Sequence, residues 1–369
     1  MKGDIRLLAL LTDGYGARGG IARYNQDLFG ALAEAGAFTL ILPRLGGISD
    51  QTLPPGLEQA PSIFGRFRYF LRTLWAGWRR RPFDVVFCGH IYMATLGWMV
   101  ARLLGARFWL QAHGAEVNQA PGRLTRRAVE AADLVTVVSR ATRRALLEWA
   151  DLAPERVRVL SDTVRDTFVP GPPSGTLQAR WNLGPGPILL TVGRLAASER
   201  YKGHEQIFAV LPALREKFPG LVYVVAGEGD DRARLEALAV ELVGDRNAVR
   251  FVGFVAEEAL PDLYRTADLF VMPSANEGFG IVYLEAAACG LRVVGGVGGG
   301  SGDAIGEQIG VRVEPNDREA LVEAIERLLG QGRVDPGAIE PYRRKNFAIV
   351  AQRLLARLMA HPRRMKDAA

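Results

Sequence analysis

Two glutamates stand eight residues apart in the segment 274–290, where a glycine-containing loop leads into a predicted helix. Glu277 lies in the loop beside Gly278, and Glu285 lies more than one turn inside the helix. Free N–H groups at the start of a helix attract phosphate, and carboxylates accept hydrogen bonds from hydroxyls. The spacing therefore favours a ligand with phosphate at its middle and a sugar at each end, which is the layout of a nucleotide-sugar.

The same two glutamates also have a purely structural interpretation. Glu285 would then be a surface residue of the helix, and Glu277 would complement the positive end of the helix dipole. Glutamates are common in helices and in the loops that precede them, so the rest of the chain must decide between the two interpretations.

Two cations occupy comparable positions earlier in the chain. Arg194 follows an apolar strand directly after Gly193, and Lys202 precedes Gly203 at the start of a predicted helix. Arginine binds phosphate with two parallel N–H groups and lysine binds it as a point charge, so together they can clamp a diphosphate. Two solvated surface cations are the alternative.

The sequence predicts no metal site. It has no His, Cys, Asp and Glu cluster at metal-ligand spacing, and no Asp-x-Asp pair to hold a divalent ion on a diphosphate. We therefore expect Arg194, Lys202 and helix N-termini to balance the phosphate charge without a metal.

Two glycine-rich loops follow predicted strands. Gly295–Gly302 has six glycines in eight residues, which lets the backbone approach a ligand closely; a flexible loop without a ligand is the alternative. Gly14–Gly19 has the G-x-G-x-x-G pattern of dinucleotide sites, but the next strand ends at Arg44 and lacks the expected acid. An NADP-dependent oxidoreductase is therefore a second hypothesis, and a glycine-lined ligand loop is favoured.

His113 directly follows another predicted strand, within Gln111-Ala-His113-Gly114. Ligands of parallel sheets bind beyond the carboxyl ends of the strands, so a histidine at this position points toward the ligand side. His113 is therefore a candidate catalytic residue, with a purely structural histidine as the alternative.

Residues 64–82 contain six arginines, no acids and several aromatic side chains. A basic amphipathic helix with aromatics suits an anionic membrane surface. The alternative is a helix that packs its aromatic face on its own domain and leaves the arginines solvated.

Composition bounds the class of protein. The 369 residues predict two domains, and the net charge of +6 is weak evidence for a nucleic-acid partner, so none is expected. Cys88 and Cys289 suggest no disulfide framework, which favours a reducing compartment. The apolar run Ile5–Leu11 is too short for a signal peptide, and no run is long enough to span a membrane. We expect a cytoplasmic protein, with peripheral attachment to the inner face of the cytoplasmic membrane through 64–82.

Short apolar runs alternate with amphipathic stretches along the whole chain, which predicts parallel, doubly wound sheets. The fold class is therefore α/β, with two Rossmann-like domains facing across a cleft. A Pro- and Gly-rich segment at 169–187 marks the boundary, giving domains at 1–170 and 171–341. The predicted strands are Ile5–Leu11, Phe38–Leu42, Asp84–Cys88, Arg107–Gln111, Leu134–Val138, Val157–Leu160, Ile188–Val192, Val222–Ala226, Val249–Val252, Leu269–Met272 and Arg292–Gly295.

The chain resembles the family-4 retaining glycosyltransferases of the GT-B fold, of the bacterial surface-polysaccharide type. The resemblance covers most of the chain and is strongest in Thr191–Gly203, Ala226–Asp230, Phe251–Phe254 and Ser274–Gly290. The Glu-x7-Glu spacing around Gly278-Phe279-Gly280 is specific when it follows Gly193-Arg194-Leu195 and Lys202-Gly203.

The resemblance implies a role for each candidate residue. Arg194 and Lys202 would neutralise the donor diphosphate, Glu285 would hold the ribose hydroxyls, and Glu277 would contact the donor sugar. His113 would lie near the transferred sugar. The remaining implied donor contacts are Gly19, Gly20, Gly193, Gly278, Phe279 and Gly280. The last helix, at 342–363, would cross back onto the N-terminal, acceptor-side domain, and the C-terminal domain would bind the donor.

The sequence departs from the family pattern at two places. The family usually carries a glutamate shortly after the glycine pair that follows the strand at 292–295, whereas Asp303 is the only acid near this loop. The common Asn-Gly before the interdomain linker is also absent, and Ser161-Asp162-Thr163 stands there instead.

The expected activity is transfer of a sugar from a UDP- or GDP-linked donor to an acceptor hydroxyl, with retention, no cofactor and no metal. The acceptor would be a saccharide or lipid-linked saccharide of surface-polysaccharide assembly. A non-catalytic nucleotide-sugar-binding protein is a third hypothesis, beside the NADP-dependent oxidoreductase.

Overall fold

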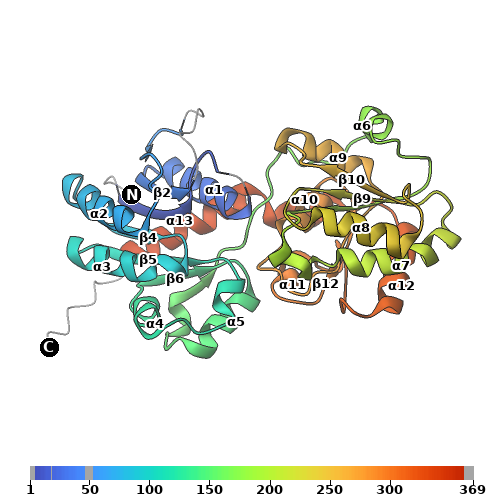
Figure 1. The fold of residues 1–369 in the computed structure, drawn as a ribbon. Helices are drawn as coiled ribbons and strands as arrows, with labels where there is room; N and C mark the ends of the chain where they lie inside the picture. The colour runs from blue at the N-terminus through green and yellow to red at the C-terminus, as the bar shows by residue number, and fades with distance from the viewer. Residues whose placement is uncertain (1–4, 18, 46–52, 361–369) are drawn as a thin grey trace. The chain divides into compact units, whose positions relative to one another are not determined.

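The computed structural model describes residues 5–17, 19–45 and 53–360, and the chain divides into two compact units (Figure 1). One unit ends at Thr163 and resumes at Arg344, and the other comprises Val164–Arg343. Sequence analysis placed this boundary at 170/171. Residues 361–363 of the expected last helix lie outside the described part of the chain.

The first unit is built on a parallel sheet, as predicted. Its strands are β1 (Arg6–Asp13), β2 (Phe38–Leu45), β3 (Leu57–Gln59), β4 (Val85–Cys88), β5 (Arg107–Ala112), β6 (Leu134–Val137) and β7 (Val157–Val159). They lie in the order β3-β2-β1-β4-β5-β6-β7, which is a doubly wound topology. The buried faces of these strands are almost wholly apolar, because helices cover both sides of a parallel sheet.

The helices of this unit alternate with the strands. They are α1 (Gly20–Glu34), α2 (Arg66–Arg79), α3 (Ala94–Leu104), α4 (Arg123–Glu130), α5 (Arg140–Trp149) and α13 (Arg344–Ala360), with the 3-10 turns η1 (Ile91–Met93), η2 (Ala115–Val117) and η3 (Pro154–Arg156). The last of them, α13, packs along α1 although the two are at opposite ends of the sequence (Figure 1). Arg344 pairs with Glu34 at 2.6 Å, and Gln352 donates to the carbonyl of Ala31 at 2.8 Å.

The second unit has a sheet of the same type. Its strands are β8 (Ile188–Val192), β9 (Val222–Ala226), β10 (Val249–Gly253), β11 (Leu269–Met272), β12 (Arg292–Gly296) and β13 (Gly310–Val313), in the parallel order β10-β9-β8-β11-β12-β13. Its helices are α6 (Gly175–Arg180), α7 (His204–Lys217), α8 (Arg232–Val243), α9 (Leu260–Thr266), α10 (Ile281–Ala288), α11 (Ser301–Ala304) and α12 (Arg318–Leu329), with the 3-10 segments η4 (Ala197–Lys202), η5 (Glu257–Ala259) and η6 (Pro336–Tyr342).

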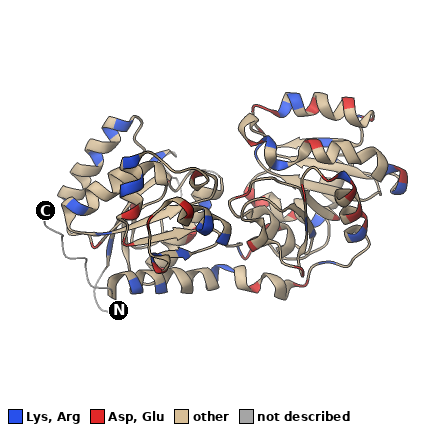
Figure 2. Ribbon diagram, turned by 90° about the horizontal axis from the view of Figure 1, so that it is seen from below, with Lys and Arg blue, Asp and Glu red and all other residues tan. Residues whose placement is uncertain are grey.

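Four short helices and strands were not predicted. The strands β3 and β13 have three and four residues, and α11 also has four. The helix α6 lies inside the Pro- and Gly-rich segment that the sequence suggested as a linker. Basic side chains are spread over helices of both units (Figure 2). Among the described residues, no helix combines the length and apolar composition needed to cross a membrane.

Candidate functional site

The centre of the second sheet is the point where the chain changes its direction of winding. β8 and β11 are neighbours there, although β9 and β10 separate them in sequence. Ligands of doubly wound sheets bind beyond the carboxyl ends of such a strand pair. Gly193 and Arg194 follow β8, and the loop that carries Glu277 follows β11, so the topology itself brings two of the predicted segments together.

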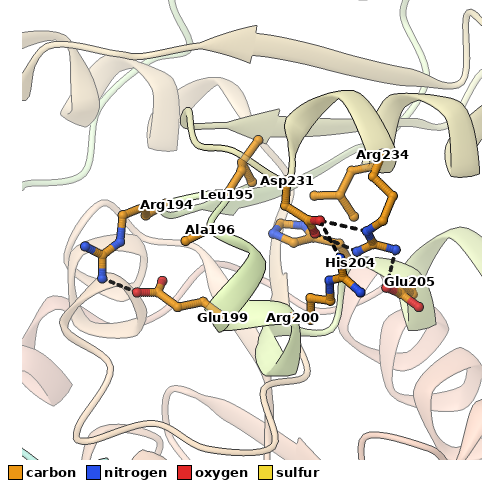
Figure 3. A pocket seen from close by; sticks show the side chains of 10 residues that line it. Arg194, Leu195, Ala196, Glu199, Arg200, His204, Glu205, Asp231 and Arg234 are labelled. Carbon is orange, nitrogen blue, oxygen red and sulfur yellow. Dashed lines mark hydrogen bonds and ion pairs between the residues drawn. The ribbon is translucent and has the colours of Figure 1, made fainter.

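One carboxylate joins the two predicted cations. Glu199 accepts a hydrogen bond from Nη2 of Arg194 through Oε1 (Figure 3). Its Oε2 pairs with Nζ of Lys202 at 2.7 Å. The Lys202 ammonium also donates to the carbonyl oxygen of Arg194 at 3.3 Å. Sequence reasoning missed Glu199, although an acid three residues before a lysine is a common ion-pair spacing in helical turns.

Tight backbone packing fixes the position of this cationic segment. Gly203 has φ +88°, in the left-handed region, and a Cβ at this residue would lie 2.7 Å from atoms of Pro273. The amide of Ala275 donates to the carbonyl of Tyr201 at 2.8 Å. The end of η4 is therefore held against the loop that follows β11.

Glu277 lies beside these cations with unused hydrogen-bonding capacity. Its Oε1 is buried and has no partner, and Ser274 hydrogen-bonds to the same carboxylate. Burial raises the pKa of Glu277, and the positive charge of Lys202 opposes this shift only in part. An unpartnered buried acceptor is costly, so this oxygen is suited to accept a hydrogen bond from a ligand hydroxyl.

The glycine-rich loop after β12 packs against the loop that carries Glu277. Gly299 forms a β-bridge with Glu277, and Gly300 donates to the Glu277 carbonyl at 2.6 Å. A Cβ at Gly299 would lie 2.1 Å from that carbonyl oxygen. The glycines are thus explained by the close approach of two backbones, and neither flexibility nor a ligand is required to account for them.

Glu285 is buried, with 2% of its surface exposed, so the interpretation as a surface helix residue is wrong. It accepts a hydrogen bond of 2.8 Å from the hydroxyl of Tyr264 on α9. Gly278 and Gly280 lie between the two glutamates, and Gly280 opens α10 with φ +88°. The ring of Phe279 is buried near Tyr342, so only its main chain can face a ligand.

In the first unit, His113 follows β5 as predicted. Its Nε2 lies 3.1 Å from the carbonyl oxygen of Gly89, and because a carbonyl can only accept, Nε2 carries the proton. Burial lowers the pKa of His113 well below its usual range, although the nearby charge of Glu116 opposes the shift. His113 is therefore neutral at pH 7.

His90 is a second histidine at this edge of the sheet, and sequence reasoning missed it. It follows β4, the neighbour of β5, and its ring centroid lies 6.2 Å from that of His113. Its Nδ1 accepts a hydrogen bond from the amide of Tyr92, whose exposed ring stacks on it. A histidine within two residues of the end of a strand, as His113 is, was the signal that could have identified it.

The glycine loop after β1 is filled by a side chain of its own unit. Gln59 accepts from the amide of Tyr15 at 2.8 Å and donates to the Tyr15 carbonyl at 2.9 Å. Its Oε1 lies 2.4 Å from where a Cβ of Gly14 would be. This arrangement does not favour the dinucleotide interpretation. Gly19 and Gly20 are exposed at the start of α1.

The segment 64–82 forms α2, and its aromatic face points to solvent. Phe67, Trp75 and Trp78 are 72%, 54% and 65% exposed, whereas the residues that α2 buries are Tyr69, Thr73, Ala76 and Gly77. Tyr69 therefore packs on its own domain, as the alternative held, while Phe67, Trp75 and Trp78 face solvent. In the described part of the chain, no three His, Cys, Asp or Glu side chains are grouped as a metal site would require.

Comparisons with known proteins identify the family to which the chain belongs. The model described as "Glycosyl transferases group 1" matches residues 177–344, and "Glycosyltransferase Family 4" matches residues 18–166. A glycogen synthase of Mycobacterium tuberculosis is 30% identical over 363 residues, covering 87% of this chain and 84% of that protein. The GDP-mannose-dependent alpha-(1-6)-phosphatidylinositol monomannoside mannosyltransferase of Mycolicibacterium smegmatis is 28% identical over 360 residues, covering 89% and 90%.

Solved structures show the same fold. A sucrose-phosphate synthase from Thermosynechococcus elongatus superposes with a TM-score of 0.77 at 24% identity, over 96% of this chain and 99% of that one. Anabaena HepE in complex with UDP-glucose superposes with a TM-score of 0.76 at 18% identity, over 96% and 99%. The two doubly wound units are those of the GT-B fold. The chain belongs to family 4 of the glycosyltransferases.

Proposed function

We propose that this glycosyltransferase moves a sugar from a nucleoside-diphosphate-sugar to an acceptor hydroxyl and retains the anomeric configuration. The observation that carries the proposal is the grouping of Arg194, Lys202 and Glu277 at the carboxyl ends of β8 and β11. Two cations beside a carboxylate with an unpartnered oxygen match a diphosphate joined to a polyhydroxylated sugar.

Each group has a role in this proposal. Arg194 and Lys202 neutralise the diphosphate as its negative charge grows in the transition state, which is the largest electrostatic contribution in such reactions. Glu277 accepts a hydrogen bond from a donor-sugar hydroxyl, and Glu285 holds the ribose. Main-chain groups at Gly193 and along Gly278–Gly280 complete the donor contacts.

The first unit contributes the remaining groups of the proposed site. Neutral His113 lies near the transferred sugar, and Gly19 and Gly20 at the start of α1 meet the diphosphate. These two roles come from the family resemblance.

The proposed reaction needs neither a metal nor a cofactor. The bond between the anomeric carbon and the donor phosphate oxygen breaks, and a bond from that carbon to the acceptor oxygen forms. The acceptor proton passes to the departing phosphate oxygen, so charge and atoms balance without a protein nucleophile. The cations supplied by Arg194 and Lys202 stabilise the leaving group in place of a metal.

Two nucleotides are candidates for the donor. The mycobacterial mannosyltransferase relative is GDP-mannose-dependent, and the Anabaena structure contains UDP-glucose. We therefore propose a UDP- or GDP-linked sugar.

For the acceptor, we propose a lipid-linked or membrane-presented saccharide of surface-polysaccharide assembly, reached from the cytoplasmic side of an anionic membrane. The support is the exposed aromatic face of α2, whose arginines lie among the exposed rings. Arg72 and Arg81 lie 4.9 Å and 3.6 Å from the ring centroids of Trp75 and Trp78. Aromatic rings flanked by arginines suit the boundary between headgroups and acyl chains.

Thermal shift with UDP, GDP, ADP, NADP and NAD tests the donor proposal in wild type and Glu285→Ala. A ligand at about 100 times its Kd adds about 2.7 kcal/mol of stability. We expect one nucleoside diphosphate to stabilise the wild type and to lose this effect in Glu285→Ala. Stabilisation by NADP alone, unchanged in the variant, would move the chemistry to the glycine loop after β1.

A further inference from the structure

Glu199 already occupies the groups that a diphosphate would need. One carboxylate oxygen pairs with the guanidinium of Arg194 (Figure 3). The other pairs with the ammonium of Lys202. The Glu199 and Lys202 side chains are only 12% and 13% exposed, while that of Arg194 is 72% exposed. Lys202 is thus largely buried in the unit, whereas Arg194 faces solvent.

Glu199 is charged at neutral pH. Burial opposes its ionisation, but the hydrogen bonds and charges of Lys202 and Arg194 together outweigh burial and hold the pKa below its ordinary value. The same negative charge raises the pKa values of Tyr201 and Glu277, after the larger effect of burial. The field of Glu199 therefore extends to the carboxylate proposed to contact the sugar.

A carboxylate and a phosphate bind a guanidinium through the same two-pronged geometry. A donor that approaches Arg194 must either displace Glu199 or share the cations with it. The exposed Arg194 is the partner that a donor can reach first, because the Lys202 side chain is only 13% exposed. The neighbouring Arg200 pairs with Asp231 at 3.2 Å and does not take the place of Arg194 beside Glu199 (Figure 3).

We propose that Glu199 is an internal counter-anion that holds the diphosphate position on Arg194 and Lys202 and is displaced when the donor binds. Donor binding is then an ion exchange, and Glu199 sets the affinity for the nucleoside diphosphate. The inference rests on the proposed function, because it concerns the same two cations. It also gives Glu199 a part in product release, since the returning carboxylate competes with the nucleoside diphosphate that remains.

Isothermal titration calorimetry with UDP, GDP and inorganic pyrophosphate tests this inference in wild type and Glu199→Gln. Glutamine keeps the size and the hydrogen-bonding oxygen but removes the charge. We expect the Kd of the nucleoside diphosphate to fall about tenfold, as one nearby unit charge is removed at a partly exposed site. Glu205→Gln is the matched control, because it removes a charge that pairs with Arg234 at 2.7 Å in the same region. It is expected to change the Kd by less than about twofold.

A gain in affinity cannot come from a damaged fold, so the expected result is separable from a structural defect. If the wild type binds UDP or GDP and Glu199→Gln binds it equally well or more weakly, Glu199 is not a displaceable counter-anion. The proposed function is not affected by that result. A Glu199→Ala variant repeats the comparison without the amide. A wild type that binds neither nucleotide would overturn both proposals. An equal gain in Glu205→Gln would show a general charge effect and would also overturn the role of Glu199.

Discussion

The hydroxyl of Tyr264 donates a hydrogen bond of 2.8 Å to Oε2 of Glu285, and both side chains are buried. Tyr264 lies on α9 and Glu285 on α10, so the orientation of the carboxylate depends on a neighbouring helix. A buried carboxyl group that loses a hydrogen-bond donor is less well stabilised. The proposed ribose contact therefore depends on both α9 and α10, although the sequence motif includes only residues of α10 and its leading loop.

Tyr264→Phe is expected to weaken both stability and nucleotide binding. The lost hydrogen bond is expected to lower the free energy of unfolding by about 0.5–1.5 kcal/mol, measured by urea unfolding. The Kd for the nucleoside diphosphate rises because Glu285 is no longer held in one orientation. Tyr69→Phe is the control, since its buried hydroxyl donates to the Leu42 carbonyl at 2.8 Å in the other unit. Unchanged nucleotide affinity in Tyr264→Phe would contradict the role of this hydrogen bond.

The doubly wound sheets could be predicted because buried parallel strands are continuous apolar runs. Leu269–Met272 and Ile188–Val192 are such runs, and both form strands as expected. The strand Leu57–Gln59 could not be found in this way, since its three residues pair only with β2 at the sheet edge. Short edge strands have little apolar pattern, and their position is fixed by the neighbouring strand.

The sequence predicts those residues of the candidate site that stand at or directly after the ends of strands. Arg194, Glu277 and His113 stand at or after the ends of strands, so the sheet topology directs them to the ligand edge. The contact of Glu199 with Arg194 and that of Gln59 with Tyr15 are made by long side chains that bridge segments, and sequence spacing does not predict these two contacts. The role of the glycines in Gly295–Gly302 could not be predicted either, because a glycine that lets a ligand approach and a glycine that lets another backbone pack closely look the same in the sequence.

Arg194→Ala and Lys202→Ala are each expected to lower kcat/KM by about 100- to 1000-fold, because each removes a charge that stabilises the leaving diphosphate. The fold should be retained, as judged by circular dichroism. Arg200→Ala is the control, since Arg200 is half exposed and pairs with Asp231 instead. Near-normal turnover in both Arg194→Ala and Lys202→Ala would contradict the proposal that these cations bind the diphosphate.

The double variant Trp75→Ser and Trp78→Ser is expected to lose binding to anionic vesicles in a flotation assay. Both rings are more than half exposed, so their removal should leave stability nearly unchanged while it removes the groups that insert at the interface. Val240→Ser and Leu242→Ser, at exposed apolar positions of α8, are the matched control. A wild type that does not float with anionic lipids would instead favour a soluble acceptor.

His204 gives a prediction for acid pH. Burial lowers its pKa to about 4, and the charge of Lys202 adds to this shift, so the folded protein keeps the ring neutral. The unfolded chain has its ordinary pKa near 6.5 and binds a proton first as the pH falls. The contribution of His204 is therefore fully present above about pH 6.5 and is lost as the pH falls toward 4.

Between pH 7 and pH 5 this single group should cost about 2 kcal/mol of stability. The readout is the difference between wild type and His204→Asn in urea unfolding at the two pH values. The whole-protein slope alone is not suitable, because burial and the nearby Asp27 raise the pKa of Asp162 to about 7, which acts in the opposite direction. His204→Asn is expected to be less stable at pH 7, where the ring's contact with the Tyr223 hydroxyl at 3.0 Å is lost. It should nevertheless lose about 2 kcal/mol less than wild type on acidification. Equal losses in the two proteins would show that His204 is not held neutral by its burial.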